Sequence, residues 1–414
     1  MLIAEWIGVD RGIWWITHAQ AHGMAQIFGF TGLFTVGVGF HVVPRFRNGA
    51  IRFPLPQRVV LITIVVSVIL RFAGQSINRH PTTGVLAVIS AVLLLIGALV
   101  FSATIFNTLR SGRTPRGAAE RWIFMAIFWF AVSAALHLRL TLWLFDHEAS
   151  IAPYFHNIAV IESGLFGFVF CFIFAVSNRA VIGFLGLKPI HNTAEIASWA
   201  LFNAGLAILV VSRVFDARTE VSSSGVLLMT VGMILFVYAI RVLEPSSTRR
   251  PPISPGAYPR FGRFLRSAYV WLIISAVLLG VEAIEEISNT SIFPADSTLP
   301  VLHVATVGFA TFMVTGMGSR MIPLFEGSIL PWHKLMDAAF YLLTISVFSR
   351  TIGGFVTGTA GDWLLGISGS TGLIAVICGF LPILWSLRKS SRDKYTELAQ
   401  ELGRIKWAES KAQN

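Results

Sequence analysis

The chain has 414 residues, of which 55% are hydrophobic and only 13% are charged, and its mean hydropathy is +0.71. Because a soluble globular domain carries roughly 25% charged residues, this composition excludes a chain built mainly of soluble domains. The formal net charge is +11, which would suit a nucleic-acid partner only if the cations gathered on a soluble surface.

The apolar residues fall in long blocks, for example residues 83–106. About 20 apolar residues in a helix cross a hydrocarbon core of about 30 Å. The backbone has to satisfy its own hydrogen bonds in lipid, so blocks of this kind form helices. The expected spans, about eleven in all, are 18–43, 58–74, 83–109, 120–145, 155–184, 194–214, 222–243, 264–287, 299–323, 335–354 and 363–387. The sequence therefore predicts an all-α integral membrane protein with a single transmembrane domain over residues 1–414.

Basic residues gather in three odd-numbered loops between the expected spans and in the tail, which begins with Arg388, Lys389, Arg392 and Lys394. Those in the loops are Arg45, Arg47, Arg52 and Arg58 in the first loop, Arg110, Arg113, Arg116 and Arg121 in the third, and Arg249, Arg250, Arg260, Arg263 and Arg266 in the seventh. The intervening loops are poor in Lys and Arg or are acidic. This positive-inside pattern predicts an N-terminus outside and a C-terminus in the cytoplasm, and it argues against a nucleic-acid partner.

The dipeptide Gly-Phe recurs in three of the expected helices, beginning at Gly29, Gly167 and Gly308. Each interval between these glycines holds four helices, so the units that they open point the same way through the membrane. We therefore expect three parallel four-helix repeats around a pseudo-threefold axis along the membrane normal. The repeats span about 14–146, 151–290 and 297–387, and the third lacks its last helix. The alternative is that Gly-Phe recurs only because small residues let helices pack closely.

Further residues recur at fixed offsets from the three glycines. Twelve positions after each glycine, at the expected inner surface, stand His41, Arg179 and Arg320. Five positions further stand Phe46, Phe184 and Phe325. The next helix carries, near its outer end, Arg71, Arg213 and Arg350. Five positions before each glycine, at matched depth, stand Met24, Glu162 and His303.

Histidines concentrate at the outer ends of the helices that open the repeats. They are His18 and His22 in the first, His156 in the second and His303 in the third, and His137 approaches the same level. Ionisable residues within spans are costly and mark candidate functional sites. Imidazoles from separate helices suit haem iron or copper, because imidazole is neutral when it ligates a metal. The arginines Arg71, Arg213 and Arg350 could neutralise haem propionates, since guanidinium presents a fork of donors that matches a carboxylate.

Simpler readings remain open for the same residues. A histidine at a helix entry can be an interfacial residue, and an outer arginine can extend to lipid phosphates. A transporter would instead place polar groups at a midplane site on broken helices, and a non-catalytic sensor or assembly subunit would need no cofactor. The cysteines Cys171 and Cys378 lie in apolar spans, and no CxxCH motif is present, so a covalently attached haem is not expected.

The segment from Leu302 to Gly308, followed by Gly316-Met317-Gly318-Ser319-Arg320, resembles the Leu-His-x-x-Thr-Val-Gly … Arg motif of the NnrS family. That family consists of bacterial membrane proteins of the nitric oxide response that bind haem and copper. The segment from Thr17 to Met24 resembles the family's opening histidine pair, although here three residues separate the histidines rather than one. A family histidine after Arg320 is replaced by Leu324-Phe325-Glu326-Gly327, and the family usually has twelve helices.

A weaker resemblance links His22-Gly23 and the later Pro44 to the second helix of haem–copper oxidase and nitric oxide reductase catalytic subunits. The expected sixth span, 194–214, has no histidine, so a complete binuclear site is not expected.

The resulting hypothesis is a multi-pass protein of the bacterial cytoplasmic membrane, in nitric oxide response or membrane electron transfer. A b-type haem is expected between His22 and His303, with the arginines Arg71, Arg213 and Arg350 near its propionates. A second metal, copper, is assigned to His18, His156, His137 and Glu162. A redox partner protein would dock at the outer face. The tail, residues 388–414, is expected to form a cytoplasmic amphipathic helix on the membrane surface.

Overall fold

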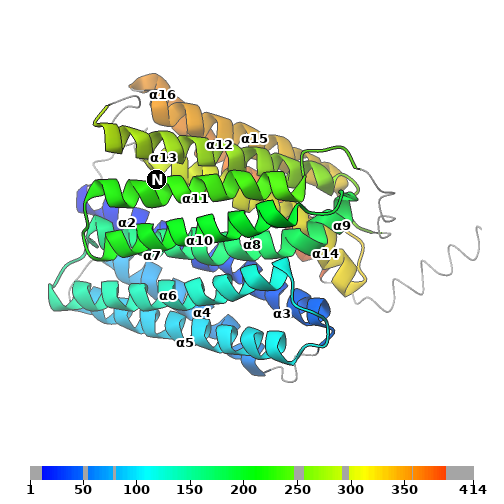
Figure 1. Cartoon of the computed structure of the whole chain (residues 1–414). Coiled ribbons are helices and arrows are strands. Elements are labelled where there is room, and N and C mark those ends of the chain that lie inside the picture. Colours follow the sequence, from blue (N-terminus) through cyan, green and yellow to red (C-terminus); the bar gives the residue numbers. More distant parts are fainter. Residues whose placement is uncertain are drawn as a thin grey trace, which may run out of the picture.

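The structure is a computed structural model that describes residues 12–49, 55–77, 81–246, 256–290, 298–356 and 358–387. The described chain is a bundle of long helices that run side by side (Figure 1). Eleven helices within it are long and apolar enough to cross a membrane. The predicted all-α membrane fold is therefore confirmed, whereas the tail from residue 388 onward lies outside the described residues and its amphipathic helix stays a prediction.

The helices fall into three successive units. The first unit contains α2 (Gly12–Met24), η1 (Ala25–Gly32), α3 (Leu33–Arg47), α4 (Leu55–Ile77), α5 (Thr82–Ser111) and α6 (Ala118–Asp146). The second contains α7 (Tyr154–Glu162), η2 (Ser163–Phe170), α8 (Cys171–Val176), η3 (Ser177–Val181), α9 (Ile182–Leu185), α10 (Asn192–Val214), α11 (Thr219–Ile240) and α12 (Phe261–Ser288). The third contains α13 (Thr298–His303), η4 (Val304–Thr311), α14 (Phe312–Glu326), α15 (His333–Phe355) and α16 (Thr359–Ser386).

Each predicted span overlaps one observed helix and differs from it by a few residues at either end. The helices α2, α7 and α13, which open the three units, lie toward the same end of the bundle, and α3, α9 and α14 lie toward the other (Figure 1). We refer to the first of these as the outer end, after the charge pattern of the loops. The orientation itself stays a prediction.

In each unit an eight-residue π-helical segment follows the opening helix at the same sequence register. In η1, η2 and η4 the Gly-Phe dipeptide holds the fifth and sixth positions. A π-helix carries one extra residue per turn and is rare, and short π segments are frequent at functional sites. Three such segments of equal length support the predicted repeat, although the threefold arrangement of the units stays a prediction.

The recurring glycines make room for a tryptophan of the preceding helix. A Cβ atom added at Gly167 would lie 2.5 Å from the Cβ of Trp129 in α6, and one at Gly308 would lie 2.9 Å from the Cβ of Trp271 in α12. The last helix of one unit therefore packs directly on the first helix of the next. At Gly29, which no earlier unit precedes in the chain, the neighbour is Val68 of α4 at 3.3 Å.

Eight residues before each of these tryptophans, an arginine pairs with a carboxylate of the next unit. Arg121 of α6 pairs with Glu195 of α10, and Arg263 of α12 pairs with Asp337 of α15. Glu195 is fully buried and also accepts a hydrogen bond of 2.9 Å from Trp122 Nε1. These two matched pairs join successive units near their inner ends.

The residues twelve and seventeen positions after the glycines meet across the units. Their contacts are His41 stacked on Phe325 at 5.4 Å, Arg179 over Phe46 at 5.0 Å and Arg320 over Phe184 at 5.0 Å. Each pair joins two different units, and together the three pairs join all three. Arg320 is 3% exposed, so it is a packed side chain rather than a surface residue at the inner boundary.

Candidate functional site

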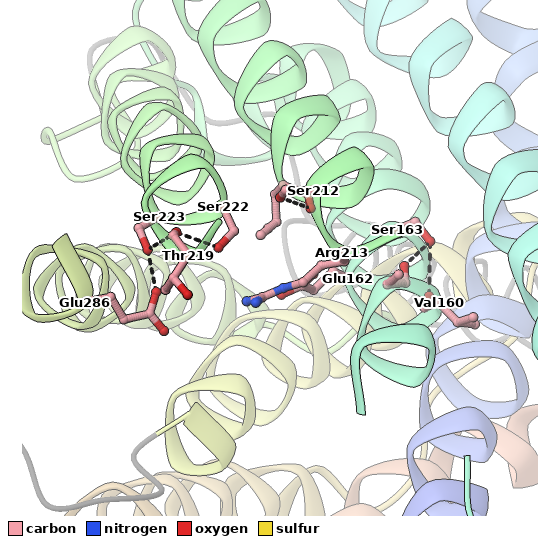
Figure 2. Close-up of polar contacts among 11 residues, drawn as sticks. Val160, Glu162, Ser163, Ser212, Arg213, Thr219, Ser222, Ser223 and Glu286 are labelled. Carbon is pink, nitrogen blue, oxygen red and sulfur yellow. Dashed lines mark hydrogen bonds and ion pairs between the residues drawn. The ribbon is translucent and has the colours of Figure 1, made fainter. Parts of the chain in front are cut away.

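Arginines on the second helix of two units reach the same position on the first helix of their unit. Arg213 Nε of α10 lies 3.6 Å from Glu162 Oε2 of α7 (Figure 2). Arg350 of α15 contacts His303 Nε2 of α13 at 3.3 Å. Because Glu162 and His303 both stand five residues before their Gly-Phe, these contacts agree with the predicted register and bring four of the predicted site residues together in pairs.

In the first unit the equivalent position is Met24, whose thioether is a poor acceptor for a guanidinium. Arg71 of α4 is 1% exposed, and none of its three guanidinium nitrogens has a hydrogen-bond partner among the described residues. It lies close enough to His137 of α6 to interact with it electrostatically. His137 is fully buried, and neither ring nitrogen has a partner within the described ranges.

The ring of His22 is exposed although it lies inside the first span. Its neighbours on the inward face of α2, Ala21 and Met24, are buried. Arg350, on a helix of the third unit, lies close enough to His22 to interact with it electrostatically. Arg350 therefore lies near a histidine of each unit, since it contacts His303 of the third unit and is within electrostatic reach of His22 of the first.

The first and third units touch in their inner halves and much less in their outer halves. Phe34 of α3 would lie 3.3 Å from a Cβ atom at Gly318 of α14, and Phe30 packs against Phe380 at 5.2 Å. At the outer end α2 packs against α4 and α7, and α13 packs against α15 and α12, whereas α2 and α13 make no comparable contact within the described chain. In the outer half, therefore, the helix that carries His22 and the helix that carries His303 do not pack against each other.

The residues assigned to a second metal have different immediate neighbours. His18 packs edge-on against Phe72 at 5.8 Å, and His156 packs edge-on against Trp143 at 6.1 Å. Among the described residues, no group of three or more His, Cys, Asp or Glu side chains could hold a metal ion. The copper ligand set therefore stays a prediction, without a matching cluster in the described chain.

Sequence reasoning missed two glutamines of the first unit, the partly buried Gln20 and the buried Gln75. Gln20 of α2 bonds both backbone groups of Ala152, donating to its O at 2.9 Å and accepting from its N at 3.0 Å. Gln75 of α4, one helical turn from Arg71, donates to Gln20 at 3.4 Å. These contacts fix α2 against the loop before the second unit. The only signal in the sequence was that each glutamine places a polar amide within an otherwise apolar span.

The family model described as NnrS protein matches residues 1–388. The chain belongs to the NnrS family. A search of curated proteins finds no match. The match covers almost the whole chain, so it confirms the resemblance found in the histidine motifs, and together with the eleven spans it supports a multi-pass membrane protein of the nitric oxide response. The weaker resemblance to haem–copper oxidases gains no support from these comparisons.

Proposed function

We propose that this NnrS-family protein binds a b-type haem between His22 and His303 and acts in electron transfer or sensing during nitric oxide stress. The observation that carries the proposal is the exposed side chain of His22 inside a membrane span, within electrostatic reach of Arg350, which in turn contacts His303. A buried helix face would ordinarily cover such a ring, and lipid offers it no hydrogen-bond partner. Imidazoles from two separate helices are a usual ligand pair for haem iron.

Arg350 fits the same proposal as a partner for a haem propionate. Its guanidinium contacts His303 Nε2, the atom that would ligate iron, so haem binding requires this side chain to turn away. The freed guanidinium would then be available to a carboxylate within the same region, with which it can form paired hydrogen bonds. If His22 and His303 both bound the iron, no coordination position would remain open, which would favour electron transfer over gas binding.

Copper, which membership of the family suggests, is a weaker part of the proposal. The described residues bring no three potential ligands together, so the proposal rests on haem. An outer-facing haem site in a bacterial cytoplasmic membrane would place its redox partner protein outside that membrane. This orientation follows from the distribution of basic residues among the loops.

The proposal is tested by the visible absorption spectrum of the detergent-purified full chain, reduced minus oxidised, after expression with haem supplied. We expect the bands of a low-spin b-type haem. The substitutions His22→Ala and His303→Ala should each give a high-spin spectrum or loss of haem, because one axial ligand is removed. The matched control is His333→Ala, at the inner end of α15, which should leave the spectrum unchanged. A colourless protein would contradict the proposal.

The substitution Arg350→Gln tests a residue that would neighbour the haem without ligating its iron. We expect haem retention to fall by roughly tenfold with the spin state unchanged, as is usual for groups outside the first coordination shell. If both histidine variants keep a normal low-spin spectrum, the ligand assignment is wrong, and His18 and His156 become the next pair to substitute.

A further inference from the structure

The interior of the first unit contains two polar side chains whose nitrogen atoms have no hydrogen-bond partner among the residues that the structure describes. Arg71 and His137 come from α4 and α6, and both are almost completely removed from the surface. Five of their nitrogen atoms lack a hydrogen-bond partner among the described residues. The side-chain oxygen of Gln75, which lies on the same face of α4 as Arg71, also has no hydrogen-bond partner among the described residues.

Such an arrangement is costly unless something compensates it. An unpaired buried hydrogen-bonding group costs about 1–3 kcal/mol, and an unpaired buried charge costs more. A guanidinium does not escape this cost by releasing its proton, because arginine stays protonated in proteins. A membrane span also offers no water from the lipid side. The arginine therefore calls for an acceptor that the described residues do not supply.

The other two units show which acceptor is missing. Arg213 meets the carboxylate of Glu162, and Arg350 meets the imidazole of His303. The corresponding residue of the first unit is Met24, which is 3% exposed and on the face of α2 that points into the protein. Methionine is long and flexible, so it can yield to an incoming group. The first unit thus keeps the arginine and lacks its internal partner.

We propose that the first unit binds a planar monovalent oxyanion, such as a carboxylate, between α2, α4 and α6, with Arg71 and His137 as its donors. The fork of a guanidinium matches the two oxygens of a carboxylate, and a ring N–H of His137 adds a third donor. The carboxylate could belong to a small free anion or to a propionate of a bound haem. The site itself does not depend on the proposed haem ligands.

The test uses the full chain purified in detergent without haem, with formate as the probe. We expect formate to raise the melting temperature in a saturable way, on the order of 2–4 °C, since binding to the folded state stabilises it. Chloride at the same ionic strength should not reproduce this rise, because a sphere cannot use the fork geometry. Absence of a formate-specific rise in the haem-free protein would overturn the proposal.

Met24→Glu supplies the carboxylate that the second unit already has. We expect this variant to melt at a higher temperature than the parent and to lose the response to formate, because its own side chain fills the site. Arg71→Met should also lose the response. The matched control is Arg320→Met, which removes another buried arginine at the inner end and should keep the response. A Met24→Glu variant that still responds fully to formate would contradict the placement of the site.

The haem-loaded protein distinguishes the two sources of the carboxylate. If loading abolishes the formate response, a propionate fills the site, and if the response persists, the site takes a free anion. Either result supports the site, because both require the response in the haem-free protein. Failure of the haem proposal would leave the formate titration unaffected, so the two proposals fail separately.

Discussion

The inner and outer ends of the helices use their recurring charged residues in different ways. At the inner end the recurring contacts join different units, as Arg121 does with Glu195 and Arg179 does with Phe46. At the outer end they stay within one unit, as Arg213 does with Glu162. The recurring residues therefore hold the units together at the inner end, whereas at the outer end the residue at the arginine's partner position differs from unit to unit.

This difference indicates which positions can hold different residues without a loss of contacts between the units. An outer partner can be Glu162, His303 or Met24 at one register position, because no contact between units depends on it. An inner partner cannot vary as freely, because Glu195 and Asp337 each hold an arginine that belongs to the preceding unit. Cofactor and ligand binding is therefore expected at the outer end, and the inner end is expected to determine stability.

The largest expected effect of an inner substitution is at Glu195. Glu195→Leu removes the acceptor of both Arg121 and the buried Trp122 Nε1. We expect the free energy of unfolding to fall by roughly 2–3 kcal/mol, mainly because the buried Trp122 Nε1 is left without an acceptor. Reversible unfolding in detergent, followed by tryptophan fluorescence, would measure it.

Glu195→Gln is the matched control for that prediction. It keeps an oxygen for Trp122 and removes only the charge opposite Arg121, whose side chain is 38% exposed. We expect a loss of about 1 kcal/mol or less, because a partly exposed pair contributes little. The haem spectrum should be the same in both variants. A change of spin state in either would contradict the inference that the inner end determines stability without affecting the outer-end site.

The Gly-Phe glycines should show a graded cost that follows the space around them. An added methyl group meets Trp129 at Gly167, Trp271 at Gly308 and Val68 at Gly29, at 2.5, 2.9 and 3.3 Å respectively. Overpacking of this kind costs about 1–3 kcal/mol. We therefore expect the melting temperature to fall most for Gly167→Ala and least for Gly29→Ala.

Gly37→Ala is the control, because a Cβ atom at Gly37 meets no other atom within 4 Å. Alanine has the higher helix propensity, so this variant should melt at the same temperature or slightly higher. An equal loss in all four variants would mean that helix flexibility, rather than packing between units, explains why glycine stands at these positions.

Much of the fold could be predicted because lipid imposes simple rules on the sequence. The eleven spans follow from apolar length alone, and the recurrence of Gly-Phe indicated matched positions in three helices, where π segments, which the sequence did not predict, are found. The reason why glycine stands there could not be predicted, because it depends on packing against Trp129 and Trp271, which lie 38 and 37 positions earlier in the sequence. Sequence spacing shows which residues recur and does not show which residues touch.

The candidate site was predicted as a list of side chains, and the structure supplies their pairing. The shared level of the histidines and arginines followed from their places in the spans. That Arg350 would meet His303, while Arg71 would face His137, depends on helix rotation. Helix rotation cannot be read from helices whose apolar residues surround them on all sides. For the same reason Arg320 was expected at the inner surface, where two phenylalanine rings instead enclose it.

The smallest expected effect concerns Tyr258, which lies before α12 and outside the spans. Its hydroxyl donates to Asp337, the carboxylate that also receives Arg260 and Arg263. Burial, and then this hydrogen bond, raise the pKa of Tyr258 above its ordinary value of 10.0. Since the folded state favours the protonated phenol, its contribution to stability is complete below about pH 10 and is lost as the pH rises through the raised pKa.

Tyr258→Phe should remove this part of the pH dependence. We expect the melting temperatures of parent and variant to converge as the pH rises above about 10, the ordinary pKa of a phenol. A difference between the two proteins that stays constant over that range would mean that Tyr258 contributes through packing against Phe264 rather than through its proton.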